Sequence, residues 1–334
     1  MKKENVLKDS KKDAFVIFTD LDGTFSPIGL KGLREFIEVV KQIKQKEDVD
    51  VKFCPVSGRP ADYVLSVMHT VDNIAKEEGI ERLAEYGAGE QGALMVESKK
   101  AYKQTFLGDS AYTNLKEDVS KVLSKNKYSN LLMDEEGKRF TCSIHIKKEV
   151  VDGLSLDKRK EIFENIKKDL IKKLDKNIEI AMSHDCMEIM TPEISKANAI
   201  NRLLGVLSRE NNVKGMMYAG DAENDKTAVK YFSNLAEIPG LKSHVFLPGN
   251  AIEGIWSKSI EDWKQKNSKT SSNRILLGEK KNFAGVVELL KKELEKGTLV
   301  SKMDRPKKTQ DDLDLYMEKG KKNRRLEKNN TLTI

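Results

Sequence analysis

Two aspartates separated by a single residue follow an apolar run near the N-terminus. Asp20 and Asp22 come after the run from Phe15 to Thr19, and Gly23 follows them. A continuous apolar run is typical of a buried strand in an α/β sheet, and ligands bind beyond the carboxyl ends of such strands. Side chains two residues apart share one side of an extended chain, so both carboxylates would face one point. Two negative charges at one point need a cation or a shared proton.

A second pair of carboxylates follows a second apolar run. Asp221 and Asp225 come shortly after the run Val213–Ala219. The carboxyl ends of parallel strands share one edge of a sheet, so these side chains are expected close to the first two aspartates. A hard divalent cation would relieve their repulsion, and magnesium is the usual ion where phosphate also binds. The four carboxylates therefore predict a Mg²⁺ site.

Positive groups and a backbone cradle could hold an anionic substrate beside these carboxylates. Lys196 stands at the start of a predicted helix, where a cation opposes the helix dipole, and Arg59 is a second candidate. Ser57 and Gly58 offer a hydroxyl and backbone N–H groups. With these parts the first aspartate could accept a phosphoryl group as nucleophile. The second could protonate the leaving alkoxide and then activate water.

Strands and helices alternate on both sides of these motifs, which predicts a parallel α/β sheet. Up to residue 98, the periodicity predicts a helix over Leu33–Ile43, a strand over Val49–Val56 and a helix over Tyr63–Val71. A glycine-rich stretch, Tyr86–Gly92, then leads into Ala93–Val96. After residue 190, it predicts a helix from Lys196 to Leu207, strands over Val213–Ala219 and Ser243–Leu247, and a closing helix over Phe283–Leu294. The polar stretch Ser257–Asn273 is expected as a surface excursion. Asn250 is typical of a turn, and it could also contact the predicted site.

The segment between these two halves has a different character. It is richer in Lys and Glu, and its patterns predict a strand over Arg139–Lys147, a helix over Ile162–Leu174 and a hairpin over Ile178–Met190 that turns at residues 183–185. Antiparallel strands with helices predict an inserted α+β module. The predicted organisation is a core of residues 1–98 and 191–296, an inserted module of residues 99–190, and a basic, disordered tail of residues 297–334.

Composition restricts the class of protein. The chain has 334 residues, 38% of them apolar, which suffices for one large or two ordinary domains. It has three cysteines at wide spacing, so neither a disulfide framework nor a zinc cluster is indicated. The sequence offers neither a membrane helix nor a signal peptide, and we expect a cytoplasmic protein. Residues 297–334 hold ten Lys or Arg against six Asp or Glu, so much of the net charge of +7 lies there.

Four groups of residues, in order, resemble the motifs of the haloacid dehalogenase superfamily of phosphatases. They are Asp20-Leu21-Asp22-Gly23-Thr24, Ser57-Gly58-Arg59, Lys196 and Gly220-Asp221-Ala222-Glu223-Asn224-Asp225. The inserted segment resembles a C2-type cap, as in subfamily IIB. Within that subfamily, the second and fourth motifs are similar to those of sucrose-phosphate and mannosyl-phosphoglycerate phosphatases and Cof-type hydrolases. The strand Cys142–Lys147 is similar to one in trehalose-phosphate phosphatases.

The resemblance implies a fold and a role for each motif. The fold is a Rossmann-like parallel sheet with an inserted α+β C2 cap. Asp20 is implied as nucleophile and magnesium ligand, and Asp22 as the acid and base that also offers its carbonyl to the metal. Ser57 binds the phosphoryl group and Lys196 stabilises its charge. Asp221 completes the metal site, with support from the two further residues Asn224 and Asp225.

The cap residues allow two interpretations. His145 and Lys147 alternate onto a polar face of one cap strand, and Glu188 belongs to the following hairpin. This face could contact the leaving group, with Glu188 on sugar hydroxyls, or it could meet water.

The motifs together predict a magnesium-dependent phosphatase of a disaccharide phosphate or related glycosyl phosphate, whose partner is a small phosphorylated substrate rather than a membrane or nucleic acid. One alternative is a phosphomutase, which returns the phosphoryl group to a second hydroxyl. The other is a binding protein that acts through its basic tail, for example on nucleic acid.

Overall fold

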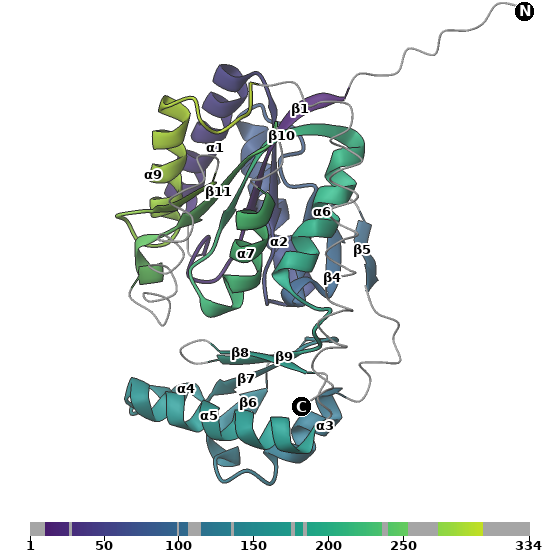
Figure 1. The fold of residues 1–334 in the computed structure, drawn as a ribbon, viewed down its shortest axis with the longest axis vertical. Helices are drawn as coiled ribbons and strands as arrows, with labels where there is room; N and C mark the ends of the chain where they lie inside the picture. The colour runs from purple at the N-terminus through teal and green to yellow at the C-terminus, as the bar shows by residue number, and fades with distance from the viewer. Residues whose placement is uncertain are drawn as a thin grey trace, which may run out of the picture.

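The structure is a computed structural model, and it describes residues 11–302 apart from 27–28, 99, 106–114, 135–136, 175–177, 183–185, 236–239 and 253–272. A parallel five-stranded sheet with the order β12-β11-β10-β1-β2 forms the centre of the larger part (Figure 1). The strands are β1 (Lys12–Thr19), β2 (Asp50–Pro55), β10 (Asn211–Ala219), β11 (Lys242–Leu247) and β12 (Asn273–Leu277). The predicted α/β class with a parallel central sheet is therefore confirmed.

Helices cover both faces of this sheet, because its strands carry apolar side chains on both sides. Phe15 and Ile17 of β1 face one layer of helices, and Val16 and Phe18 face the other. The first layer consists of α1 (Gly29–Glu47), α2 (Ala61–Glu77) and α9 (Asn282–Glu295). The second consists of α6 (Lys196–Glu210) and α7 (Lys226–Leu235). Each layer excludes water from one face of the sheet and leaves the strand ends accessible to ligands.

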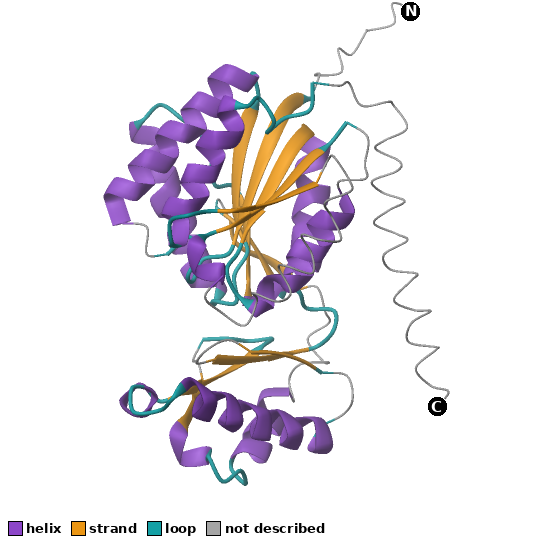
Figure 2. Cartoon of the chain, turned by 60° about the vertical axis from the view of Figure 1, so that its left-hand side comes forward, coloured by secondary structure: helices purple, strands orange, loops and turns teal. Residues whose placement is uncertain are grey.

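The inserted module is a separate layer beneath the carboxyl ends of the central strands (Figure 2). Its antiparallel sheet has the order β6-β7-β9-β8, with strands β6 (Leu132–Asp134), β7 (Cys142–Ile146), β8 (Glu179–Met182) and β9 (Cys186–Met190). Its helices are α3 (Leu115–Leu123), α4 (Lys148–Val151) and α5 (Leu156–Lys173). Apolar side chains of α3, α5 and the sheet form their own core cluster, so this cap has a hydrophobic core of its own. The predicted hairpin is present as β8 and β9, and its turn lies outside the described residues.

A small antiparallel sheet connects the two parts. It is formed by β3 (Tyr86–Gly89), β4 (Leu94–Glu97) and β5 (Lys100–Thr105), with a 3₁₀ turn, η1 (Glu90–Gly92), between the first two. Because β5 pairs with β4, the hairpin continues past the predicted boundary at residue 98. The predicted strand Arg139–Lys147 is shorter than expected, because its first three N–H groups bond to a side chain of η1 instead of a neighbouring strand.

Two further expectations need correction at the C-terminal side. The predicted polar excursion ends at Asn273, but this residue begins β12, the edge strand that pairs with β11. The rest of the excursion lies outside the described residues. The core also continues past residue 296, since Leu299 and Val300 are buried and Ser301 N donates to Lys214 O. Residues 303–334 of the predicted tail lie outside the described residues. None of the helices in the described part of the chain has the length and apolar character needed to cross a lipid bilayer.

The segment after α9 should therefore contribute to stability. Leu299 is 0% exposed, and its carbonyl lies against Gly215 of β10. We expect Leu299→Ala to lower the free energy of unfolding by about 2–5 kcal/mol, because the substitution leaves a cavity in a packed core. Leu30→Ala is the control, since Leu30 is 60% exposed and should change the value by less than about 0.5 kcal/mol. Urea unfolding measures both, and equal effects would mean that residues after 296 do not belong to the core.

Candidate active site

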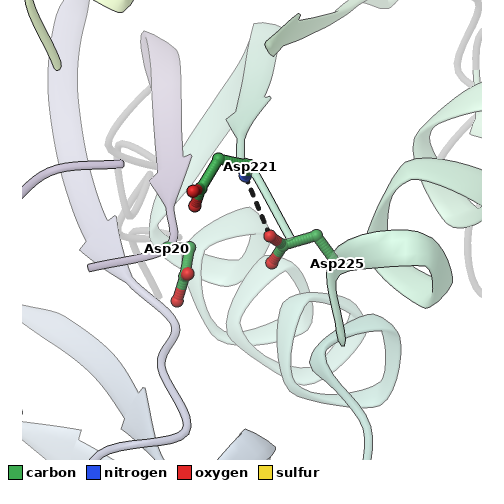
Figure 3. Close-up of side chains that lie close together, drawn as sticks. All are labelled: Asp20, Asp221 and Asp225. Atoms are coloured by element: carbon green, nitrogen blue, oxygen red, sulfur yellow. Dashed lines mark hydrogen bonds between the residues drawn. The ribbon is translucent and has the colours of Figure 1, made fainter. Parts of the chain in front are cut away.

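Pairing between β1 and β10 brings the first and fourth motifs together. Thr19 is in register with Ala219, and Asp20 N donates to Ala219 O at 2.8 Å. The chain leaves both strands at the same edge of the sheet, so the carboxylates of Asp20, Asp221 and Asp225 converge (Figure 3). One oxygen from each of these three side chains lies within 4.8 Å of the other two.

Asp225 orients the loop that carries Asp221. Its Oδ2 accepts backbone N–H groups from Asp221 at 3.0 Å and from Ala222 at 2.9 Å. Its Oδ1 accepts the Lys196 ammonium at 2.6 Å and the Tyr218 hydroxyl. These bonds occupy the carboxylate with the protein's own donors, so Asp225 mainly shapes the loop.

Lys196 is a fully buried cation between two carboxylates. Its ammonium lies 2.7 Å from Asp20 Oδ1 and 2.6 Å from Asp225 Oδ1. Burial alone would lower the pKa of Lys196, but the two carboxylates raise it above its ordinary value. Ser195 caps the helix by accepting the N–H of Asn198, which fixes the first turn and the lysine with it. The lysine is therefore held as a permanent positive charge.

The negative charges of Asp20 and Asp221 are only partly balanced by nearby positive groups. Burial raises the pKa of Asp20 well above its usual value, with Lys196 opposing this shift and Asp225 adding to it. Burial, followed by the charge of Asp225, raises the pKa of Asp221 to about 6. Asn224 Oδ1 is also buried and has no hydrogen-bond partner in the described chain. Hard oxygen donors with unbalanced negative charge fit a divalent cation such as Mg²⁺.

Asp221 is fixed by residues from two other loops. Thr24 Oγ1 donates to Asp221 Oδ1 at 2.7 Å, and Asn250 Nδ2 donates to Asp221 Oδ2 at 2.9 Å. Asn250 Nδ2 also reaches Gly23 O at 2.9 Å, and its Oδ1 accepts the N–H of Asn282. The sequence left open whether Asn250 belongs to a plain turn or contacts the site, and the structure places it after β11 against Asp221 of the fourth motif.

Asp22 stands apart from the three converging carboxylates. Its side chain is half exposed and receives Arg59 on both oxygens, at 2.7 Å from Nε and 2.9 Å from Nη2. The guanidinium also lies over the ring of Tyr63. The prediction that the Asp22 carboxylate joins the cluster is therefore wrong in this structure, and Arg59, expected to bind substrate, pairs with Asp22.

The second motif forms a tight loop after β2. Ser57 is buried, its N–H donates to Ala88 O at 2.9 Å, and its Oγ accepts the N–H of Arg59 at 3.2 Å. A Cβ on Gly58 would lie 2.6 Å from Gln91 Nε2, so a larger residue would displace the end of the Gln91 side chain. Glycine at this position therefore keeps the loop close to Gln91.

A cavity of about 440 Å³ lies between this edge of the sheet and the cap. Its core side is lined by Asp20, Asp22, Gly23, Gly58, Arg59, Asp221, Ala222 and Asn224, and its cap side by Lys138, His145, Ala181, Met182, Cys186 and Glu188. A hollow of about 640 Å³ lies at the opposite end of the sheet, beside Lys12 and Asn211. Its charged groups pair largely with one another, as Lys52 does with Asp50 and Glu85, so it lacks the unbalanced charge of the first cavity.

The cap side of the cavity is polar. Lys138 Nζ donates to Glu188 Oε1 at 2.8 Å and to Ser143 Oγ, and Cys186 Sγ lies 3.6 Å from His145 Nε2. The structure thus brings the predicted residues His145 and Glu188 to the cavity. Lys138 was not predicted, because a single lysine in a loop carries no distinctive sequence signal.

Lys147 was predicted beside His145 but is not among the residues that line the cavity. It follows the last residue of β7 and caps α4, where its N–H donates to Leu131 O at 2.8 Å. The alternation that placed it on the polar face ends with the strand at Ile146, and the contact of Lys147 to a leaving group stays a prediction.

Comparison with known proteins gives a family match and several similar folds. Residues 95–235 match the family model of haloacid dehalogenase-like hydrolases. The sucrose-phosphatase of Synechocystis sp. PCC6803, solved with sucrose and phosphate, aligns with a TM-score of 0.53 at 11% identity, over 85% of this chain and 98% of that one. The C-terminal domain of C. albicans trehalose-6-phosphate phosphatase aligns with a TM-score of 0.54 at 15% identity, over 86% and 93%. At these identities the likeness concerns the fold. No curated protein matches the chain.

Metal binding by the acidic cluster can be tested through stability. Mg²⁺ at 100 times its dissociation constant should stabilise the folded protein by about 2.7 kcal/mol. In Asp221→Asn this gain should largely disappear, while stability in EDTA is retained or raised, because one of the repelling charges is removed. Thermal unfolding in EDTA and in Mg²⁺ measures both effects.

Asp118→Asn is the matched control, because Asp118 is an exposed carboxylate of the cap that pairs with Lys121. It should keep the full response to Mg²⁺. An equal Mg²⁺ response in Asp221→Asn and the parent would contradict a metal site at this cluster.

Proposed function

We propose that this chain, which belongs to the haloacid dehalogenase-like hydrolases, is a magnesium-dependent phosphatase of a phosphorylated sugar or related polyol. The observation that carries the proposal is the position of Asp20. Its carboxylate is buried beside Lys196 and Asp221, and it lines the cavity shared by the core and the cap. A carboxylate held next to a cation and open to a cavity is suited to attack phosphorus.

The chemistry follows from the chain's own side chains. An oxygen of Asp20 forms a bond to phosphorus while the ester P–O bond breaks, which leaves an aspartyl-phosphate and an alkoxide. Asp22 gives the alkoxide a proton and then takes one from the water that attacks the aspartyl-phosphate. Lys196 lowers the energy of the charged phosphoryl oxygens throughout. Because Arg59 holds both oxygens of Asp22 in this structure, that ion pair must open before Asp22 carries a proton.

The cation would be held by Asp20 and Asp221, with the Asp22 carbonyl and Asn224 Oδ1 as further oxygens. When bound, it would neutralise negative charge on the phosphoryl group. Asp225 would act by fixing the loop of Asp221, because its oxygens already accept four donors.

The side chains of the cap favour a substrate whose leaving group carries several hydroxyls. Its side of the cavity presents a lysine, a carboxylate and a histidine, which together can donate to and accept from neutral hydroxyls. A cap that supplies these contacts also covers the reacting groups and excludes water. The two similar structures are phosphatases of sucrose phosphate and trehalose 6-phosphate by name, which supports a sugar phosphate as substrate here.

The nucleophile gives the direct test. Asp20→Asn should lower phosphate release by at least about 10³-fold and keep the fold, because it removes the attacking charge without changing the volume. The measurement is phosphate release from a panel of sugar phosphates, with and without Mg²⁺, alongside thermal unfolding. Near-parental turnover in this variant would contradict the mechanism.

The same assay separates the two alternatives. A phosphomutase would need a bisphosphate activator and would return the phosphoryl group to a second hydroxyl, whereas a phosphatase releases inorganic phosphate without one. A chain shortened after Lys302 should keep full activity. If this truncation abolished function while Asp20→Asn did not, the protein would act through its basic tail.

A further inference from the structure

The 3₁₀ turn η1 connects the phosphate loop to the cap. Glu90 N donates to Arg59 O and Gln91 N donates to Ser57 O, both at 2.9 Å. Glu90 and Gln91 have φ values of 50° and 57°, in the left-handed region that non-glycine residues rarely adopt. Strained conformations of this kind persist where surrounding contacts fix them, and they cluster at functional sites.

The Glu90 side chain binds the backbone of the cap segment that precedes β7. It is fully buried, and its carboxylate accepts the consecutive N–H groups of Arg139 at 3.0 Å, Phe140 at 2.7 Å and Thr141 at 3.2 Å. The residue before this segment is Lys138, which bonds Glu188 in the cavity. The turn therefore fixes the second motif and the polar side of the cap relative to each other.

The next residue, Gln91, carries a donor without an acceptor. The side chain is 1% exposed, and Nε2 has no hydrogen-bond partner among the residues that the structure describes. On the cap side, Glu188 is 9% exposed, and its Oε2 likewise lacks a partner within the described ranges, while Oε1 is held by Lys138. Buried polar groups are normally paired, so each of these two atoms calls for a ligand.

The donor and the carboxylate border the same small space. A Cβ on Gly58 would lie 2.6 Å from Gln91 Nε2 and 3.2 Å from Glu188 Oε1. Gly58 and Glu188 both line the cavity. The missing side chain at Gly58 thus leaves a notch between an amide donor of the core and a carboxylate of the cap.

We propose that Gln91 is a specificity residue that reads a hydroxyl of the leaving group together with Glu188. The hydroxyl oxygen accepts from Gln91 Nε2, and the hydroxyl hydrogen donates to Glu188 Oε2. A neutral hydroxyl satisfies both atoms, whereas a phosphoryl oxygen would meet the negative charge of Glu188. The inference rests on the proposed function, and it adds a core residue to the recognition of the leaving group.

This contact would couple recognition to closure of the cap. Gln91 belongs to the core and Glu188 to the cap, so one hydroxyl that bonds both ties the two parts together. A phosphate ester without hydroxyls leaves both polar atoms unpaired, which disfavours the closed arrangement. Selectivity for hydroxylated esters therefore arises at the junction of the two parts.

The test compares two substrates in two variants. Gln91→Glu keeps the length of the side chain but removes the donor, and Gln91→Asn keeps an amide that is one carbon too short and tolerates the positive φ. The substrates are the best sugar phosphate of the panel and phenyl phosphate, which has no hydroxyl. Both variants should lose about tenfold or more in kcat/KM on the sugar phosphate, mainly through KM, and stay within about twofold on phenyl phosphate. Gln42→Glu, at a half-buried site on α1 away from the cavity, should leave both values unchanged.

Each other outcome has a defined meaning. Equal losses on the two substrates would overturn the inference, because Gln91 would then serve the phosphoryl group or the shape of the loop. Unchanged kinetics on both substrates in folded variants would overturn it as well. A parent protein that releases phosphate from neither ester would overturn the proposed function and this inference with it. If the parent is active on both esters, the proposed function stands and the variants test the role of Gln91 alone.

Discussion

The excess of buried negative charge at the carboxyl ends of β1 and β10 is the constraint that governs the site. Three carboxylates converge there, and Lys196 balances only part of their charge. Water cannot relieve the repulsion where Asp20 and Asp225 are buried, so the arrangement would disperse if the side chains were free to move. The fold prevents this with fixed donors, including the N–H groups given to Asp225 and the amide that Asn250 gives to Asp221. A fixed and unbalanced charge is the form of preorganisation that phosphoryl transfer uses.

The strand order explains why these particular loops meet. β1 lies between β10 and β2, so the loop that carries Asp20 is flanked by the fourth motif on one side and by Ser57 on the other. β11 lies beside β10 on the side away from β1, so the turn after β11 is next to the fourth motif and supplies Asn250. All of these segments leave the sheet at one edge because every strand of the sheet is parallel. The site is thus a consequence of topology together with the residue types at four strand ends.

The sequence predicted the features that local patterns encode. Asp20, Asp221 and Lys196 could be recognised because each follows or begins an element whose apolar periodicity is clear, and the rule for parallel sheets then brings them together. Residues that meet their partners only through tertiary packing show no such local sequence pattern. Nothing near Asn250 or Lys138 in the chain indicates Asp221 or Glu188, and Gln91 becomes notable only once Gly58 lies against it.

The predictions that the structure contradicts also fail where contacts between distant parts of the chain decide the structure. Residue Asn273 was read as surface because its preceding neighbours are polar, yet pairing with β11 makes it a strand. Leu299 lies in a basic stretch, and its burial against Gly215 depends on a contact distant in sequence. The predicted end of a strand at Lys147 shows the opposite error, since a local alternation was extended one residue past the end of β7. Periodicity therefore gives the existence of an element more reliably than its ends.

The cap and the core are joined by a charged anchor and by a small apolar cluster. Apolar residues of α3, α5 and the cap sheet form a cluster distinct from the two clusters that flank the central sheet. The Glu90 carboxylate holds the cap through three consecutive N–H groups, and this charged anchor fixes one point while the rest of the cap packs on itself. Ala93, Met190 and Ile194 form a small apolar cluster at the junction, so the cap is attached to the core by this cluster as well as by the Glu90 carboxylate. Under the proposed function, recognition of the leaving group and coverage of Asp20 would be coupled, because one hydroxyl would bond a residue of the core and a residue of the cap.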